Sequence, residues 1–237
     1  IIDNSWNKWS YILKSEGKFS GPILGVLHAP VEGMMGSPPP VPKPCLVAIS
    51  KDQAGSVAGH LGVAARVAYN GVDMDFYKQN GEERSGRFLF LARMTKLKGA
   101  HVAVALAKKC RVPLDLVGDD TLVEDPAYAA RVKADCDGPR IVYHGGKSRE
   151  QCVNFFSSAR ALLHLNFVYR EPFGLSPIEA MACGTPAIAA DYGAMRETIK
   201  DGETGILVRT MDEAEALLKP TGRSLILDSI NPETCRE

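Results

Sequence analysis

The sequence has no long apolar run, no excess of charge of either sign and no paired cysteine motif. No stretch approaches the roughly 20 apolar residues that a membrane-spanning helix needs, and no signal peptide is visible. Lys+Arg and Asp+Glu each number 28 in 237 residues, so the formal net charge is zero. This balance argues against a nucleic-acid-binding protein, or a protein held on a membrane by bulk charge. The six cysteines are scattered without a C-x-x-C pair. They indicate free thiols in a cytoplasmic location, with peripheral binding at the inner membrane face left open.

Several common cofactor and catalytic motifs are also missing from the sequence. There is no G-x-G-x-x-G after an expected strand and no G-x-x-x-x-G-K-[ST], so dinucleotide-binding and P-loop interpretations lose their main support. No Ser/His/Asp order and no cluster with metal-ligand spacing emerges. We therefore predict no bound cofactor and no metal site.

What is present is a regular alternation of strand-like and helix-like segments. Expected strands cover 21–30, 45–50, 66–73, 87–93, 112–118, 140–145, 161–166, 185–190 and 205–208. Between them lie helical patterns, several opened by capping boxes such as Ser50 to Gln53 and Ser148 to Gln151. This alternation predicts an α/β fold with parallel sheets covered by helices on both faces.

Composition along the chain predicts two domains. Residues 31–44 are rich in proline and glycine and predict a loop, and the polar stretch 76–86 predicts a linker. We therefore expect a partial N-terminal domain over 1–75, a complete domain over 87–218 and a C-terminal extension over 219–237. Because the first residue is Ile1 rather than methionine, we expect the chain to be a fragment.

The stretch 170–188, REPFGLSPIEAMACGTPAI, carries start and stop signals for one short helix. Ser176, Pro177 and Glu179 predict an N-cap, a first helical position and a capping-box partner. Gly184 predicts the stop. With an apolar strand on each side, this is a βαβ unit, and its helix N-terminus at the carboxyl ends of the strands suits a phosphate.

A basic turn follows another expected strand. Arg93 leaves the strand, and Lys96 and Lys98 stand at the start of the next helix. Cations at this position suit a diphosphate, although a solvated basic turn is the plainer interpretation of the cluster taken alone. The matching position of 170–188, at the same edge of one sheet, favours the diphosphate.

Four segments together resemble the family-4 retaining glycosyltransferases of GT-B fold. They are LARMTKLKG (91–99), EPFGLSPIE (171–179) with AMACGTPAIA (180–189), and DGETGILV (201–208). AISKDQAGSV (48–57) and VAYNGVDMDFY (67–77) resemble the end of that family's N-terminal domain. The resemblance implies GT-B type Rossmann-like sheets, with one complete C-terminal domain and a truncated N-terminal domain.

The same resemblance implies roles for particular residues. Arg93 and Lys98 would contact the diphosphate of a nucleotide-sugar donor, and Gly174 and Leu175 would offer backbone N–H groups to its oxygens. Glu179 would accept hydrogen bonds from the ribose hydroxyls, which suits an acceptor-only carboxylate. The competing role for Glu179 is to cap its own helix.

Two more residues have implied roles with open alternatives. Glu171 would accept from the donor sugar, the alternative being a loop carboxylate paired with Arg170 or Arg196. His28 resembles the histidine that the family places near the donor sugar, but it could equally be structural. Arg196 stands where the family often has proline, so the donor-side loop is expected to differ there.

Two acidic pairs are less specific. Asp73-Met74-Asp75 is a D-x-D, a metal-holding motif in another glycosyltransferase class, but its place near the domain boundary favours a solvated hinge. Asp119 and Asp120 follow a strand. We expect them to form a turn, the alternative being contact with the nucleoside.

The function that we expect is retaining transfer of a sugar from a UDP- or GDP-sugar to an acceptor hydroxyl, without a metal or a protein nucleophile. The acceptor could be a sugar, a lipid-linked compound or a small molecule. The alternatives are a non-catalytic nucleotide-sugar-binding module and a GT-B epimerase or phosphorylase. The chain as it stands is expected to bind nucleotide but to turn over poorly, since such a site needs both domains.

Overall fold

Parallel strands form two separate sheets, one in each of two compact units. The computed structural model describes residues 2–3, 9–31, 45–81, 84–121, 125–219 and 224–236, so most of the loop expected at 31–44 lies outside the described residues. Unit 1 comprises Ile1–Gly71 with Arg170–Phe173, and unit 2 comprises Val72–Tyr169 with Gly174–Glu237.

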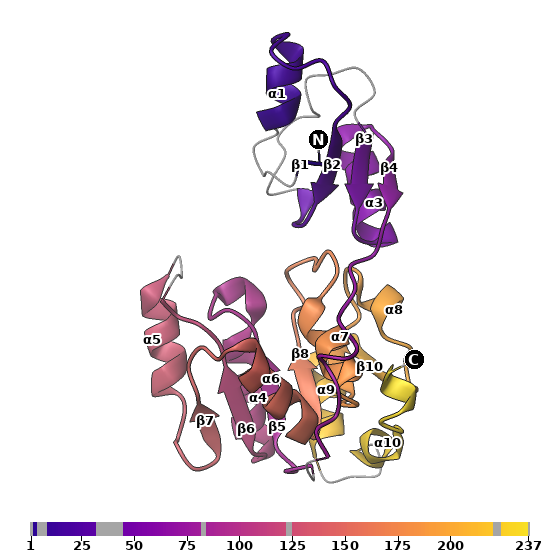
Figure 1. Cartoon of the computed structure of the whole chain (residues 1–237). Helices are drawn as coiled ribbons and strands as arrows, with labels where there is room; N and C mark the ends of the chain where they lie inside the picture. Colours follow the sequence, from indigo (N-terminus) through magenta and orange to yellow (C-terminus); the bar gives the residue numbers. More distant parts are fainter. Residues whose placement is uncertain are drawn as a thin grey trace. The chain divides into compact units, whose positions relative to one another are not determined.

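Unit 1 is built on a four-stranded parallel sheet with the strand order β1-β2-β3-β4. Its elements are β1 (Ile2–Asp3), α1 (Trp9–Ser15), β2 (Leu24–Leu27), β3 (Cys45–Ala48), α3 (Lys51–Leu61) and β4 (Ala65–Val67) (Figure 1). Leu46 of β3 and Val57 of α3 belong to one buried apolar cluster. The Tyr11 hydroxyl of α1 donates to the Cys45 carbonyl oxygen at 2.7 Å. Apolar packing and this hydrogen bond therefore hold the helices on the sheet.

Unit 2 is built on a six-stranded sheet with the order β10-β9-β8-β5-β6-β7. Its elements are β5 (Phe88–Leu91), η1 (Lys96–Lys98), α4 (Ala100–Cys110), β6 (Leu114–Val117), α5 (Pro126–Ala134), β7 (Ile141–Tyr143), α6 (Arg149–Ser158), β8 (Ala161–His164), α7 (Leu175–Ala182), β9 (Ala187–Ala190), α8 (Met195–Thr198), β10 (Gly205–Val208), α9 (Met211–Leu218), α10 (Ser224–Ser229) and η2 (Thr234–Arg236) (Figure 1). Every strand pair in it is parallel, which confirms the expected α/β fold class.

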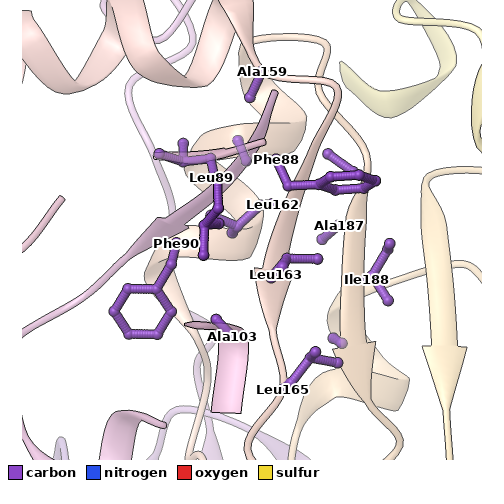
Figure 2. Close-up of a cluster of buried hydrophobic side chains, with 14 of the residues drawn as sticks. Phe88, Leu89, Phe90, Ala103, Ala159, Leu162, Leu163, Leu165, Ala187 and Ile188 are labelled. Carbon is purple, nitrogen blue, oxygen red and sulfur yellow. The ribbon is translucent and has the colours of Figure 1, made fainter. Parts of the chain in front are cut away.

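The central strands of unit 2 are almost entirely apolar, with His164 at the end of β8 as an exception, because both of their faces are covered. All four residues of β8 and all four of β9 are buried. Figure 2 shows side chains from three strands that follow one another in the sheet, among them Phe88, Leu162 and Ile188. Strands buried on both faces have continuous apolar runs rather than alternating ones.

The strand order reverses direction in the middle of this sheet. From β5 the chain steps outward to β6 and β7, then returns to β8 on the other side of β5 and steps outward again to β9 and β10. Right-handed crossovers place the helices of the two halves on opposite faces. Accordingly, α4 contacts α5 and α9, whereas α6 contacts α7. The topological switch point therefore lies at the carboxyl ends of β5 and β8, where ligands bind in such sheets.

The division between the units lies at Gly71–Val72, earlier than the linker expected at 76–86. Tyr77, inside that expected linker, is only 3% exposed and packs in the core of unit 2. Leu227 and Ile230, from the expected C-terminal extension, are buried in the same core. Aromatic and aliphatic side chains embedded in polar sequence explain both differences. No helix in the described part of the chain is long and apolar enough to cross a membrane.

Candidate functional site

The loop after β5 carries the expected cations. Arg93 is exposed at the end of the strand, and Lys98 closes the short η1 turn and is half-buried. The Lys98 ammonium lies 4.9 Å from the centre of the Tyr169 ring, a cation–π contact with the loop after β8. Two loops from neighbouring strands therefore meet at the switch point, with a cation held between them.

Asn166, which the sequence analysis did not single out, joins these two loops. Its side-chain amide donates to the Leu97 carbonyl oxygen, and its Oδ1 accepts from the Tyr169 N–H at 3.0 Å. The side chain is buried, so both hydrogen bonds are protected from water. Gly99 allows the close approach, since a Cβ there would lie 3.2 Å from the Leu165 carbonyl oxygen. A lone asparagine after a strand has no sequence pattern that reveals this role.

Helix α7 begins two residues earlier than the capping pattern predicts. Its N-cap is Gly174, with φ 84°, and no side chain caps it; Ser176 and Pro177 lie inside the first turn. The predicted Ser176 N-cap is therefore wrong. The left-handed conformation of Gly174 turns the loop directly into the helix, which a residue with a Cβ adopts only with strain. The N–H groups of Gly174 and Leu175 thus stand at the helix N-terminus, as the candidate phosphate seat requires.

Glu179 does not act as a capping-box residue. Its Oε1 accepts a hydrogen bond from the Tyr77 hydroxyl at 2.7 Å. Burial raises the pKa of Tyr77 to about 12, and the hydrogen bond to Glu179 adds to the rise. The Arg149 Nε lies 3.5 Å from the same hydroxyl, within donating distance. The capping alternative for Glu179 is therefore wrong, and sequence reasoning missed its partner, Tyr77.

The loop after β6 is packed tightly against the loop after β5. A Cβ on Gly118 would lie 2.2 Å from the Ala92 carbonyl oxygen. Asp119 closes a turn by accepting from the N–H and hydroxyl of Thr121, and Asp120 pairs with Lys133 of α5. Asp119 therefore makes the turn-forming contacts that the sequence favours, whereas Asp120 makes an ion pair with the neighbouring helix.

The candidates His28 and Glu171 belong to unit 1. His28 is exposed directly after β2. The neighbouring backbone is fixed by Gln53, whose amide donates to the Ala29 carbonyl oxygen and accepts from the Ile49 N–H. Ser50 still caps α3, but the expected capping box is only half formed because Gln53 ties the end of β2 to the end of β3.

Glu171 is buried, at 9% exposure. The two arginines considered as its structural partners both pair with aspartates. Arg170 makes two hydrogen bonds to Asp52, at 2.8 and 2.7 Å. Arg196 makes two to Asp191, which Arg209 also contacts. Arg196 thereby fixes the loop after β9.

The D-x-D segment forms a local turn. Asp73 Oδ1 accepts from the N–H groups of Asp75 and Phe76, at 3.0 and 3.1 Å. Among the residues that the structure describes, no group of three or more His, Cys, Asp or Glu side chains is placed to hold a metal ion. Asp73 therefore uses its carboxylate to start the turn that leads to Tyr77.

A model of a known protein family covers most of unit 2. The family model described as glycosyl transferases group 1 matches residues 73–231, more than half of the chain. The chain belongs to the glycosyl transferases group 1 family. This confirms the resemblance to GT-B glycosyltransferases, while the assignment to family 4 stays a prediction.

Curated relatives of the chain include D-inositol 3-phosphate glycosyltransferases. The protein from Arthrobacter sp. (strain FB24) is 31% identical over 159 residues, covering 60% of this chain and 37% of its own length. That from Paenarthrobacter aurescens (strain TC1) is 28% identical over 195 residues, covering 73% and 47%. The chain thus spans less than half the length of these relatives.

Two solved structures match this chain over its whole length. Sucrose-phosphate synthase from Thermosynechococcus elongatus superposes with a TM-score of 0.77 at 23% identity, covering 100% of this chain and 65% of that one. HepE from Anabaena, in complex with UDP-glucose, gives a TM-score of 0.74 at 17% identity, covering 100% and 76%. At these identities the likeness establishes the GT-B fold.

Proposed function

We propose that this chain supplies the donor-binding unit of a retaining glycosyltransferase, which moves a sugar from a nucleotide-diphosphate sugar to an acceptor hydroxyl. The observation that carries the proposal is the arrangement at the switch point of unit 2. There a cationic loop after β5 lies beside the loop that leads into α7, after the neighbouring strand β8. Family membership supplies the reaction class.

The diphosphate is the part of the donor that this site suits best. Lys98 and Arg93 supply positive charge, and the N–H groups at Gly174 and Leu175 supply fixed donors at a helix N-terminus. Such preorganised donors stabilise the charge that grows on the diphosphate as the sugar leaves. Lys98 is already held over Tyr169, so little reorganisation is needed when the donor binds.

In this proposal, two carboxylates bind the nucleoside and the sugar of the donor. Glu179 gives one oxygen to Tyr77, and its remaining lone pairs accept from the ribose hydroxyls. Glu171 accepts from a hydroxyl of the donor sugar, and His28 contacts that sugar. The donor is a UDP- or GDP-sugar, a choice in keeping with the UDP-glucose bound to the HepE neighbour.

The chemistry proposed is a front-face displacement. The bond between the anomeric carbon and the diphosphate oxygen breaks, the acceptor oxygen bonds to the same face, and the acceptor proton passes to the departing diphosphate. Positive charge from Arg93 and Lys98 takes the place of a metal ion in this step. An acceptor panel should include D-inositol 3-phosphate, the compound named for the curated relatives.

The proposal is tested by a thermal-shift and calorimetry screen of UDP, GDP, ADP and their glucose conjugates. We expect one nucleoside diphosphate to raise the melting temperature and to bind with measurable heat, and its sugar conjugate to bind as well. Absence of binding by all of them would overturn the proposal. In a full-length protein that carries both domains, binding without transfer to any acceptor would favour a non-catalytic module. Release of free sugar phosphate would favour a phosphorylase.

A further inference from the structure

The Tyr77 hydroxyl is buried beside the carboxylate that we assign to the ribose. Tyr77 follows the turn that Asp73 starts, and it is 3% exposed. Its ring lies edge-on to Phe76 and Phe156, with ring centres 5.0 and 6.3 Å away. Packing therefore fixes the ring, and the hydroxyl points at Glu179 Oε1 from a set position.

Arg149, the first residue of α6, fixes the hydroxyl from the other side. Its guanidinium carbon lies 4.7 Å from the centre of the Phe76 ring and 5.5 Å from that of Tyr77. Its Nε donates toward the Tyr77 oxygen at 3.5 Å. With Arg149 as donor on one side, the phenol proton is left to point at Glu179. Because the pKa of Tyr77 is about 12, this proton stays in place throughout the physiological range.

We propose that Tyr77 is a positioning residue, which orients Glu179 to receive the ribose of the nucleotide; this rests on the donor-binding function proposed above. A carboxylate on a flexible side chain loses rotational freedom when it binds two neighbouring hydroxyls. One oxygen already held by Tyr77 removes much of that loss before the ligand arrives. The competing account is that the hydroxyl is merely a satisfied buried group, which predicts an effect on stability alone.

The decisive measurement compares the affinity of Tyr77→Phe for a ribonucleotide with its affinity for the 2′,3′-dideoxy analogue, which lacks both ribose hydroxyls. The probes are UDP or GDP, whichever binds in the screen above, and its 2′,3′-dideoxy analogue. We expect Tyr77→Phe to weaken binding of the ribonucleotide by about three- to tenfold, and to change binding of the dideoxy analogue less than twofold. Tyr128→Phe is the matched control, since its buried hydroxyl contacts His101 and no proposed site residue.

Glu179→Gln separates this proposal from the one on which it rests. Discrimination here means the ratio of the affinities for the ribonucleotide and for the dideoxy analogue. If Glu179→Gln leaves this ratio unchanged, the ribose role of Glu179 is wrong, and so is the positioning role of Tyr77. If Glu179→Gln removes discrimination but Tyr77→Phe does not, only the positioning role is wrong. When both roles hold, the double variant binds the ribonucleotide no more weakly than Glu179→Gln.

A second variant covers the case in which Tyr77→Phe fails to fold. Arg149→Gln removes the guanidinium that orients the hydroxyl and leaves the Tyr77 ring in place. We expect Arg149→Gln to weaken binding of the ribonucleotide and to leave binding of the dideoxy analogue unchanged. Equal weakening of the ribonucleotide and the dideoxy analogue, or no change in either, would overturn the positioning role.

Discussion

Asp191 shows how one carboxylate can hold a loop at the edge of the sheet. Its side chain is only 7% exposed, and it accepts from Arg196 and Arg209, both of which are mostly exposed. The hydrogen bonds from Arg196 are the main cause of the lowered pKa of Asp191. The arginine that departs from the family pattern thus has a partner that stabilises the loop after β9.

We predict that Asp191→Asn lowers the free energy of unfolding by about 1–2 kcal/mol at neutral pH, since the buried carboxylate loses its charge-assisted hydrogen bonds from the two arginines. The folded-state pKa lies below the unfolded one. The contribution is therefore present above about pH 4 and disappears as the pH falls through the folded value. Urea unfolding at neutral and acidic pH measures it.

Asp228→Asn is the matched control for this change. Asp228 also receives two hydrogen bonds from one arginine, Arg160, but its side chain is 50% exposed. We expect a cost below about 0.5 kcal/mol, as for other exposed pairs. Equal costs for the two variants, or no cost at Asp191, would contradict the role given to burial.

At the scale of single elements, the N-termini of helices α6 and α7 show what the sequence can and cannot predict. Ser148 forms the full capping box of α6, with both reciprocal hydrogen bonds to Gln151. Ser176 matches the same pattern but lies inside the first turn of α7, because Gly174 takes the cap position. The sequence pattern shows which residues are able to cap a helix. The backbone conformation of the preceding loop, here the left-handed Gly174, determines which residue occupies the cap position.

We predict that Ser148→Ala costs about 1 kcal/mol of unfolding free energy, the usual value of an N-cap. Ser176→Ala should change it by less than about 0.5 kcal/mol, because no capping hydrogen bond is lost. Chemical denaturation of the two variants beside the parent measures both. A larger loss at Ser176 than at Ser148 would restore the capping interpretation of α7.

The parallel sheet was predictable from sequence because its strands are short apolar runs separated by helical periods. GILV at 205–208 became β10 with those bounds, and LARMTKLKG gave the basic loop. What could not be predicted was contact between distant residues. Tyr77 and Glu179 are 102 positions apart, and Asn166 reaches a backbone oxygen 69 positions away. Local patterns carry no information about such partners.

At the scale of the whole molecule, the positive charge of the proposed donor site comes from side chains and helix ends. We predict that binding of the nucleoside diphosphate survives EDTA, because Arg93 and Lys98 supply the positive charge near the phosphates. Calorimetry with and without EDTA measures this. Strict dependence on magnesium or manganese, lost in Asp73→Asn, would show instead that the D-x-D segment holds a metal.

The central claim is that a nucleoside diphosphate binds at the switch point of unit 2, against Lys98. The most direct test is calorimetric titration of Lys98→Ala, beside Lys108→Ala as a control. Lys108 lies near the far end of α4 and pairs with Asp135 on the surface. We predict that Lys98→Ala weakens binding by about 1.5–3 kcal/mol, tenfold or more, and that Lys108→Ala leaves it unchanged. Equal affinity of parent and Lys98→Ala would contradict the account.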